Sequence, residues 1–197
     1  IAGNSEGISM EESDNNTISS NYIGLNAAGD ADLGNTNWGI RIFNDSDSNV
    51  VGGDTAAERN VISGNGDDGI LVTDATTNAN QIIGNYIGTD STGAVDIGNG
   101  SDGISVLNGT DNTTIGSGTS GHGNVISGNG DNGVVVSSAG TTGTIIQGNT
   151  IGLSAAGTAD LGNDDNGIAV NSLAPAVTIG GTTSGEGNVI SGKAIDG

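Results

Sequence analysis

Carboxylates recur just before a short Gly-Ile segment that returns several times along this 197-residue chain. Asp68 and Asp102 hold that place in neighbouring copies of the segment, and Asp67 and Asp131 stand one position earlier in their own copies. If the copies stack as strands of a parallel sheet, Asp68 and Asp102 lie about 4.8 Å apart. Two carboxylates that close repel each other unless one binds a proton or a cation lies between them.

Calcium is the cation that such a column would suit, because it binds carboxylate and carbonyl oxygens. The predicted calcium ligands are Asp67, Asp68, Asp102 and Asp131. The alternative is a solvated turn with screened charges, which needs no ion. The chain lacks the Gly-Gly-x-Gly-x-Asp nonapeptide of calcium-binding β-rolls, and this favours the alternative.

The remaining reactive residues do not form a catalytic set. The basic residues are Arg41, Arg59 and Lys193, and His122 is the one histidine. Arg41 takes the outward position of a Gly-Ile-x-Val segment and Arg59 lies in an insertion, so we expect them on different faces. Adjacent Asp residues are common, so a carboxylate pair of the kind that glycosidases use has little specificity here. A non-enzymatic protein is therefore favoured.

Composition limits the possible partners. The chain has 23 acidic and 3 basic residues and a net charge of −20, which leaves no cationic surface for nucleic acid or for an anionic membrane. No run of about 18 apolar residues is present to span a bilayer. Cysteine is absent and aromatic residues make up 2%, so neither disulfides nor large rings hold the fold together. These features predict an extracellular or cell-surface protein with no nucleic acid partner and no membrane insertion.

The elements that position these residues repeat with a period of 64. Asn21-Tyr-Ile-Gly returns at 85–88 and 149–152, and Asn60-Val-Ile-Ser-Gly returns at 124–128 and 188–192. A fixed period predicts a solenoid. Each unit contains two unequal coils, and the register gives six: 1–20, 21–59, 60–84, 85–123, 124–148 and 149–187, with a seventh starting at Asn188.

Each coil contains three short segments rich in β-branched residues and bounded by Gly, Asn and Asp, which predicts strands rather than helices. The fold is therefore expected to be all-β, a right-handed parallel β-helix of about six coils. Four aliphatic rows should fill its interior, and two of them are Ile23, Ile62, Ile87, Ile126, Ile151, Ile190 and Ile18, Val51, Ile82, Ile115, Ile146, Ile179. The other two begin at Ile8 and Met10. Two asparagine rows should form ladders at turns, one of Asn4, Asn35, Asn65, Asn99, Asn129, Asn163 and one of Asn21, Asn60, Asn85, Asn124, Asn149, Asn188.

Three insertions, 25–33, 89–97 and 153–161, fall two coils apart, so we expect them on one side of the rod at a spacing of about 9.6 Å. Each has an Asp before an apolar residue, as in Asp32-Leu33, and that apolar residue is expected to pack against the wall. The insertions are interpreted as covering loops. Alternatively, they form a ridge that shapes a groove for a glycan.

The pattern Asn-x-Ile-Ser-Gly-Asn, Asp-Gly-Ile-x-Val and Ile-Gly-Gly resembles the right-handed parallel β-helix repeats of large secreted bacterial and archaeal proteins, within the pectate-lyase-like β-helix superfamily. The resemblance covers essentially the whole chain. It implies a giant surface or adhesin-like parent protein, although the same fold also hosts polysaccharide lyases, hydrolases and epimerases.

The predicted function is a structural or adhesive rod segment of an extracellular surface protein or fibre. Neither end carries a capping segment, so residues 1–197 are expected to be one segment of a longer solenoid or to stack on copies of themselves. The predicted partners are such copies or adjacent repeats, with extracellular polysaccharide as a further partner and calcium as a stiffening ion. The rival function is a carbohydrate-binding or polysaccharide-processing module.

Overall fold

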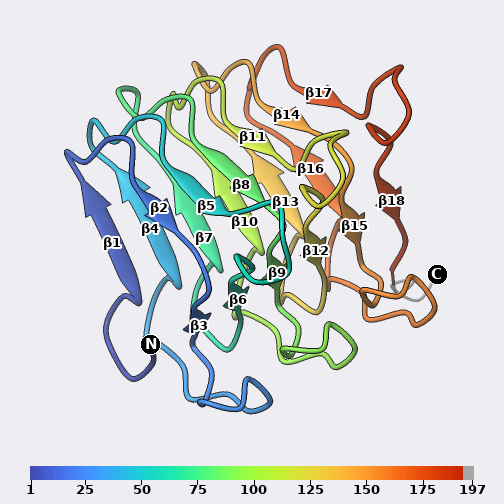
Figure 1. The fold of residues 1–197 in the computed structure, drawn as a ribbon. Helices are drawn as coiled ribbons and strands as arrows, with labels where there is room; N and C mark the ends of the chain where they lie inside the picture. Colours follow the sequence, from blue (N-terminus) through green and yellow to red (C-terminus); the bar gives the residue numbers. More distant parts are fainter. Residues whose placement is uncertain (193–197) are drawn as a thin grey trace.

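A computed structural model describes residues 1–192 as a parallel β-helix built from eighteen short strands in three six-stranded sheets (Figure 1). Sheet A contains β1 (Ile8–Glu11), β4 (Ile40–Phe43), β7 (Ile70–Val72), β10 (Ile104–Val106), β13 (Val134–Val136) and β16 (Ile168–Val170). Sheet B contains β2 (Thr17–Ile18), β5 (Val50–Gly52), β8 (Gln81–Ile83), β11 (Thr114–Ile115), β14 (Ile145–Ile146) and β17 (Thr178–Ile179). Sheet C contains β3 (Tyr22–Ile23), β6 (Val61–Ile62), β9 (Tyr86–Ile87), β12 (Val125–Ile126), β15 (Thr150–Ile151) and β18 (Val189–Ile190).

The coil length follows from the strand register. Ile8 of β1 and Ile168 of β16 are 160 residues and five turns apart, so a turn averages 32 residues, half of the 64-residue repeat. Each strand pairs in parallel with its equivalent one turn away, as Ile62 does with Ile23 and with Ile87. The prediction of an all-β parallel solenoid with a double-coil repeat is confirmed. None of residues 1–192 belongs to a helix that could cross a membrane.

The interior consists of the four predicted aliphatic rows. Their members pair in register along sheets A, B and C, and the central ones, such as Ile62, Ile82 and Ile104, are completely buried. Mostly branched aliphatic side chains stacked on similar ones fill a narrow tube without aromatic rings, which explains a stable interior in a chain so poor in large residues.

Both predicted asparagine ladders are continuous. Asn85 is fully buried; its Oδ1 accepts a hydrogen bond from Asn60 Nδ2 (2.9 Å) and its Nδ2 donates to Asn124 Oδ1 (3.1 Å). The same Nδ2 donates to the carbonyls of Val51 and Ile83. Each amide therefore joins three coils and satisfies turn carbonyls that would otherwise be buried without partners.

A third polar column, between sheets A and B, was not predicted. Asn16, Asn49 and Asn80 bond to one another as in the other ladders, with Asn49 Nδ2 donating to Asn80 Oδ1 at 3.1 Å. The two following coils place Thr113 and Thr144 there, and their buried Oγ1 atoms have no hydrogen-bond partner within residues 1–192. The column therefore changes from a satisfied ladder to unsatisfied hydroxyls.

Glycine ends each sheet C strand of the longer coils for a steric reason. Gly88 has φ of +87°, and a Cβ at this position would lie 2.1 Å from the Ser127 carbonyl oxygen of the next coil. Only glycine adopts this backbone while letting two coils approach so closely.

Candidate functional site

The predicted acidic column exists and forms a ladder on the outside of the rod. The Asp102 backbone N–H donates to Asp68 Oδ1 (3.1 Å), and Asn132 donates to Asp102 Oδ1 through its backbone (2.9 Å) and its Nδ2 (2.8 Å). Asn166 Nδ2 donates in turn to Asn132 Oδ1 (2.8 Å). In this column each donor lies one coil after its acceptor along the chain, whereas in the buried ladders each donor lies one coil before it. The direction is reversed because the carboxylates of the first two members can only accept hydrogen bonds.

Asp68 is the perturbed member of this column. Its side chain is 7% exposed, and burial, followed by the carboxylates of Asp102 and Asp67, raises the pKa of Asp68 to about 6. Asp102 keeps both oxygens bonded, since Ser105 Oγ donates to its Oδ2 at 3.1 Å. Proton uptake by Asp68 therefore relieves the repulsion in this pair near pH 6 without a cation.

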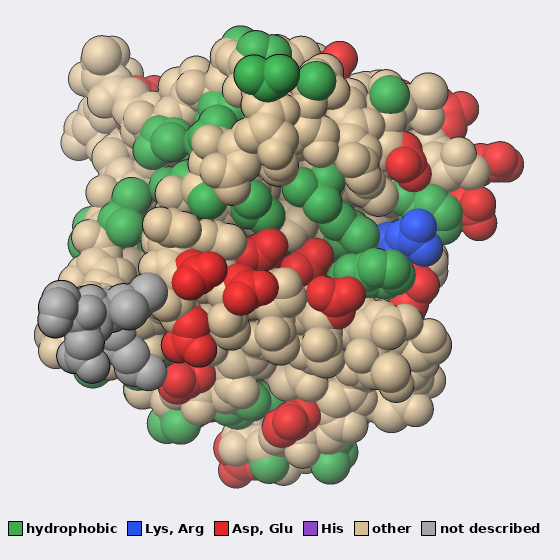
Figure 2. Space-filling view, turned by 180° about the vertical axis from the view of Figure 1, so that it is seen from behind, with side chains coloured by type: hydrophobic (Ala, Val, Ile, Leu, Met, Phe, Trp, Pro, Cys, Tyr) green, Lys and Arg blue, Asp and Glu red, His purple; other side chains and the backbone are tan. Residues whose placement is uncertain are grey.

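The four predicted calcium ligands are only partly brought together. Asp68 and Asp102 are neighbours, whereas Asp131 is exposed and accepts a hydrogen bond from Ser101 Oγ at 3.0 Å. Within residues 1–192 no three His, Cys, Asp or Glu side chains are arranged to hold a metal ion. Figure 2 shows Asp and Glu side chains gathered in a band across one face of the molecule, below a band of hydrophobic side chains. Calcium binding at Asp67, Asp68, Asp102 and Asp131 stays a prediction.

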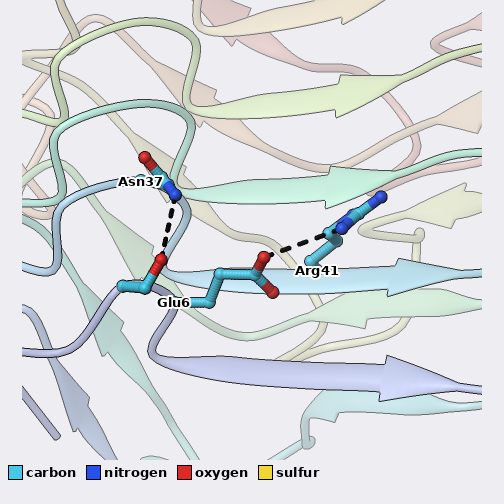
Figure 3. A network of polar contacts seen from close by, with 4 residues as sticks. Glu6, Asn37 and Arg41 are labelled. Atoms are coloured by element: carbon cyan, nitrogen blue, oxygen red, sulfur yellow. Dashed lines mark hydrogen bonds and ion pairs between the residues drawn. The ribbon is translucent and has the colours of Figure 1, made fainter.

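The two described arginines lie on different faces, as expected. Arg41 is on the outer face of sheet A, where its guanidinium carbon lies 3.8 Å from the centre of the Phe43 ring and 4.8 Å from that of Trp38. Arg41 Nη1 is 3.6 Å from Glu6 Oε1 (Figure 3). Beside this pair, Asn37 Nδ2 donates to Ser5 Oγ at 3.2 Å. Arg41 therefore has a carboxylate counterion, Glu6, and contacts two aromatic rings.

His122 also has a local role. Its Nδ1 lies 2.8 Å from Ser117 Oγ within loop 117–123, and its backbone N–H donates to the Thr119 carbonyl. This contact orders a surface turn, and no carboxylate of residues 1–192 lies within ion-pair distance of the imidazole. Lys193 lies outside the described residues.

The three insertions form a continuous ridge, closer together than expected. The Ser91 N–H donates to the Gly29 carbonyl (2.7 Å) and the Ala155 N–H donates to the Gly93 carbonyl (2.8 Å), so arms 25–33, 89–97 and 153–161 touch. Figure 1 shows these arms, in blue, green and orange, projecting on the same side. The bases are two coils apart, but the arms lean along the axis and satisfy backbone groups in one another.

The expectation that the apolar residue after each arm Asp packs against the wall was wrong for the first arm. Leu33 is 61% exposed, whereas the equivalent Ile97 and Leu161 are half-buried. Leu25, at the start of the same arm, is buried instead and pairs with Asp32 across the antiparallel hairpin. The hairpin places its first residue against the coil, and the residue after Asp32 faces outward.

Sequence reasoning missed a hollow over sheet C. The arms follow β3, β9 and β15, whereas loops 53–59, 117–123 and 181–187 precede β6, β12 and β18, so the two sets of insertions lie at opposite ends of the strands of this sheet. We call the outward row of sheet C between them the trough. A hollow of about 230 Å³ lies in this trough near the N-terminal end. It is lined by Ser20, Tyr22, Ala56, Ala57, Arg59, Val61 and Ser91. The sequence signal was the pairing of two insertions in each 64-residue unit, one after a strand of sheet C, such as β3, and one before the next strand of that sheet, such as β6.

Comparison with known proteins gave no relative. No family model matches the chain, and neither a curated protein nor a solved structure resembles it significantly. The fold class is therefore defined by the structure alone: a parallel β-solenoid with asparagine ladders.

Proposed function

We propose that this chain is a rigid, non-enzymatic rod segment of an extracellular surface protein or fibre. The observation that carries the proposal is the continuity of the two buried asparagine ladders across all six coils. Each rung is fastened to the next by side-chain amides as well as by backbone bonds, so bending or shearing the rod would break many hydrogen bonds together.

The expected setting and partners follow from the surface. A net charge of −20 keeps such a rod soluble and disfavours nucleic acid and anionic membranes. Adjacent repeats of the same chain, or further copies, are the proposed partners, because a repeating coil presents the same backbone spacing to the next one. Calcium at the Asp68–Asp102 column is proposed as an additional stiffening ion.

Pulling on single molecules tests the rod role. Cysteines introduced by Ser5→Cys and Ser184→Cys, both exposed, provide handles in a chain that has none. We expect resistance and rupture in steps of whole coils, a lower rupture force in Asn85→Leu, and an unchanged force in Asn171→Ala at an exposed asparagine. A chain that extends smoothly without force peaks would overturn the proposal.

A second candidate function is a carbohydrate-binding module, and the trough over sheet C favours it. Insertions lie at both ends of the sheet C strands, and successive arms contact one another along the axis, an arrangement that would suit an extended polymer. Catalysis on such a polymer has weaker support, because no basic residue converges with a carboxylate pair anywhere in residues 1–192. Binding without cleavage is the form of this candidate that the geometry favours.

A further inference from the structure

The hollow in the trough over sheet C contains a cation without a counterion. Arg59 lies with its guanidinium carbon 3.9 Å from the centre of the Tyr86 ring, and its Nε donates to the Gly84 carbonyl at 3.3 Å. It forms no ion pair with any residue of the described part of the chain. This contrasts with Arg41, which is paired with Glu6. In a chain with 23 acidic residues, an arginine without a carboxylate partner is unusual.

The surroundings hold Arg59 in place. Stacking on Tyr86 and the bond to Gly84 fix the plane of the guanidinium, so its terminal nitrogens retain their donors for a ligand. The neighbouring Glu58 is engaged elsewhere, because its Oε2 accepts hydrogen bonds from the backbone and hydroxyl of Thr55. Those bonds also lower the pKa of Glu58. The loop therefore uses its own carboxylate internally and leaves the arginine free.

Tyr22 forms the opposite side of the hollow. Its ring is 37% exposed and rests against the arm at Gly29, where a Cβ would approach the ring to 2.8 Å. Tyr22 and Tyr86 both pair with Val61, so one strand separates the two rings. The hollow above Val61 is thus bounded by a phenol ring on one side and by a stacked guanidinium on the other.

We infer that this hollow binds a six-membered ring that carries a carboxylate. The carboxylate would accept two parallel hydrogen bonds from the Arg59 fork, and the ring would pack on the exposed face of Tyr22. Ser91 on its arm and Ser20 beside loop 53–59 line the same hollow. Their hydroxyls donate to the Ala28 and Ala57 carbonyls, so they offer lone pairs that can accept from ring hydroxyls. The site goes beyond the rod role and does not depend on it.

The site occurs once in the described chain, although its scaffold repeats. One unit further on, Thr150 replaces the second tyrosine, and Gly123 replaces the arginine; Gly187 replaces it again. The interior rows do not vary in this way. The following 64-residue unit is therefore an internal control, because it has the same scaffold without the arginine and without the second tyrosine.

Binding of small acids tests the inference. The probes are D-glucuronate, which has a saturated ring, and benzoate, which has a flat ring. D-glucose and benzamide are the matched compounds without the carboxylate, and acetate is the matched compound without the ring. Titration is followed by the side-chain Nε–Hε resonance of Arg59 and the ring resonances of Tyr22. We expect at least one ring acid to shift both sets and to bind at least about tenfold more tightly than its neutral counterpart and than acetate. The tighter of the two acids identifies a sugar acid or an aromatic acid as the natural class.

Variants then separate the site from general electrostatics. Arg59→Gln should weaken binding of the ring acid at least about tenfold, and Tyr22→Thr, which copies Thr150, should weaken it by a smaller factor. Arg41→Gln is the control and should leave binding unchanged, because Arg41 lies on another face. The proposal would be overturned if the ring acids bound no more tightly than their neutral counterparts or than acetate. It would also be overturned if Arg59→Gln bound the ring acids as tightly as the unmodified chain does. Circular dichroism confirms that each variant retains its β-structure.

Discussion

The interior of this solenoid and the trough over sheet C follow different rules, although the same coils build both. Inside, the aliphatic rows keep aliphatic residues, mostly Ile and Val, and the two buried asparagine ladders keep asparagine from coil to coil. In the trough, Tyr22 and Tyr86 are followed by Thr150, and Arg59 has glycine at its equivalent positions. Packing tolerates few substitutions in a narrow tube, whereas an exposed face can differ from one repeat to the next. Differences between repeats therefore point to recognition, and uniform columns point to support.

Substitution of a glycine at a close contact between coils should lower the free energy of unfolding the most. In Gly88→Ala the new methyl group would lie 2.1 Å from the Ser127 carbonyl, at a φ of +87°. We expect a loss of more than about 4 kcal/mol of unfolding free energy, measured by urea denaturation. The control is Gly157→Ala, which also has positive φ (+68°) but open space around it, and should cost only about 1–2 kcal/mol. Equal losses would mean that backbone strain, and not coil-to-coil contact, dominates.

Removing one ladder amide should be the next most damaging change. Asn85→Leu removes the acceptor of the Asn60 N–H and of one Asn60 Nδ2 hydrogen, and it removes the donor to the Val51 carbonyl, whereas Asn124 Oδ1 keeps the backbone N–H of residue 85. We expect destabilisation of about 3–5 kcal/mol, because each unsatisfied buried group costs about 1–3 kcal/mol. The change Asn171→Ala, at an exposed asparagine, should stay within about 0.5 kcal/mol. A loss below 1 kcal/mol for Asn85→Leu would contradict the role of the ladders.

The outer acidic ladder should respond to pH. The pKa of Asp68 is raised to about 6 in the folded chain, above that of an unfolded aspartate, so folding favours the protonated carboxyl. The contribution of Asp68 to the free energy of unfolding therefore increases as the pH falls from above 6 toward 4. Asp68→Asn removes the charge and should stabilise the chain by about 3 kcal/mol at pH 8. The gain should vanish near pH 4. Denaturation across this pH range, with Asp131→Asn as the control, checks the sign and the window.

A substitution in the third polar column should have the smallest effect on the free energy of unfolding, and it should stabilise the chain. Thr113 Oγ1 is buried and unbonded, so Thr113→Val removes an unsatisfied hydroxyl while conserving volume. We expect a gain of about 1 kcal/mol in unfolding free energy, compared with no gain from Thr158→Val in an exposed arm. Destabilisation by Thr113→Val would show that its hydroxyl has a partner, such as a buried water.

Sequence alone predicted the interior better than the exterior, for a physical reason. The 64-residue spacing placed Ile62 beside Ile23 and Ile87, and Asn85 between Asn60 and Asn124, because interior columns repeat the same chemistry. The third column was missed because Thr113 and Thr144 replace asparagine, which hides the periodicity.

The outer features depend on loop geometry that spacing does not encode. The hydrogen bond between Ser91 and Gly29 arises from the lean of two arms whose bases are two coils apart. The hollow at Arg59 needs an arm that follows one strand of sheet C and a loop that precedes the neighbouring strand. Spacing did predict that Asp68 and Asp102 are neighbours, but not that the pair joins Asn132 in a ladder of reversed direction.

Hydrogen exchange, followed by mass spectrometry on the unmodified chain, Asn85→Leu and Arg59→Gly, tests the division between interior support and exterior recognition most directly. We predict that Asn85→Leu accelerates exchange in β6, β9 and β12, the strands joined by that amide. Arg59→Gly, which installs the residue found at 123 and 187, should leave the exchange of every strand unchanged. Slow exchange in all strands of Asn85→Leu, or general acceleration in Arg59→Gly, would contradict the account.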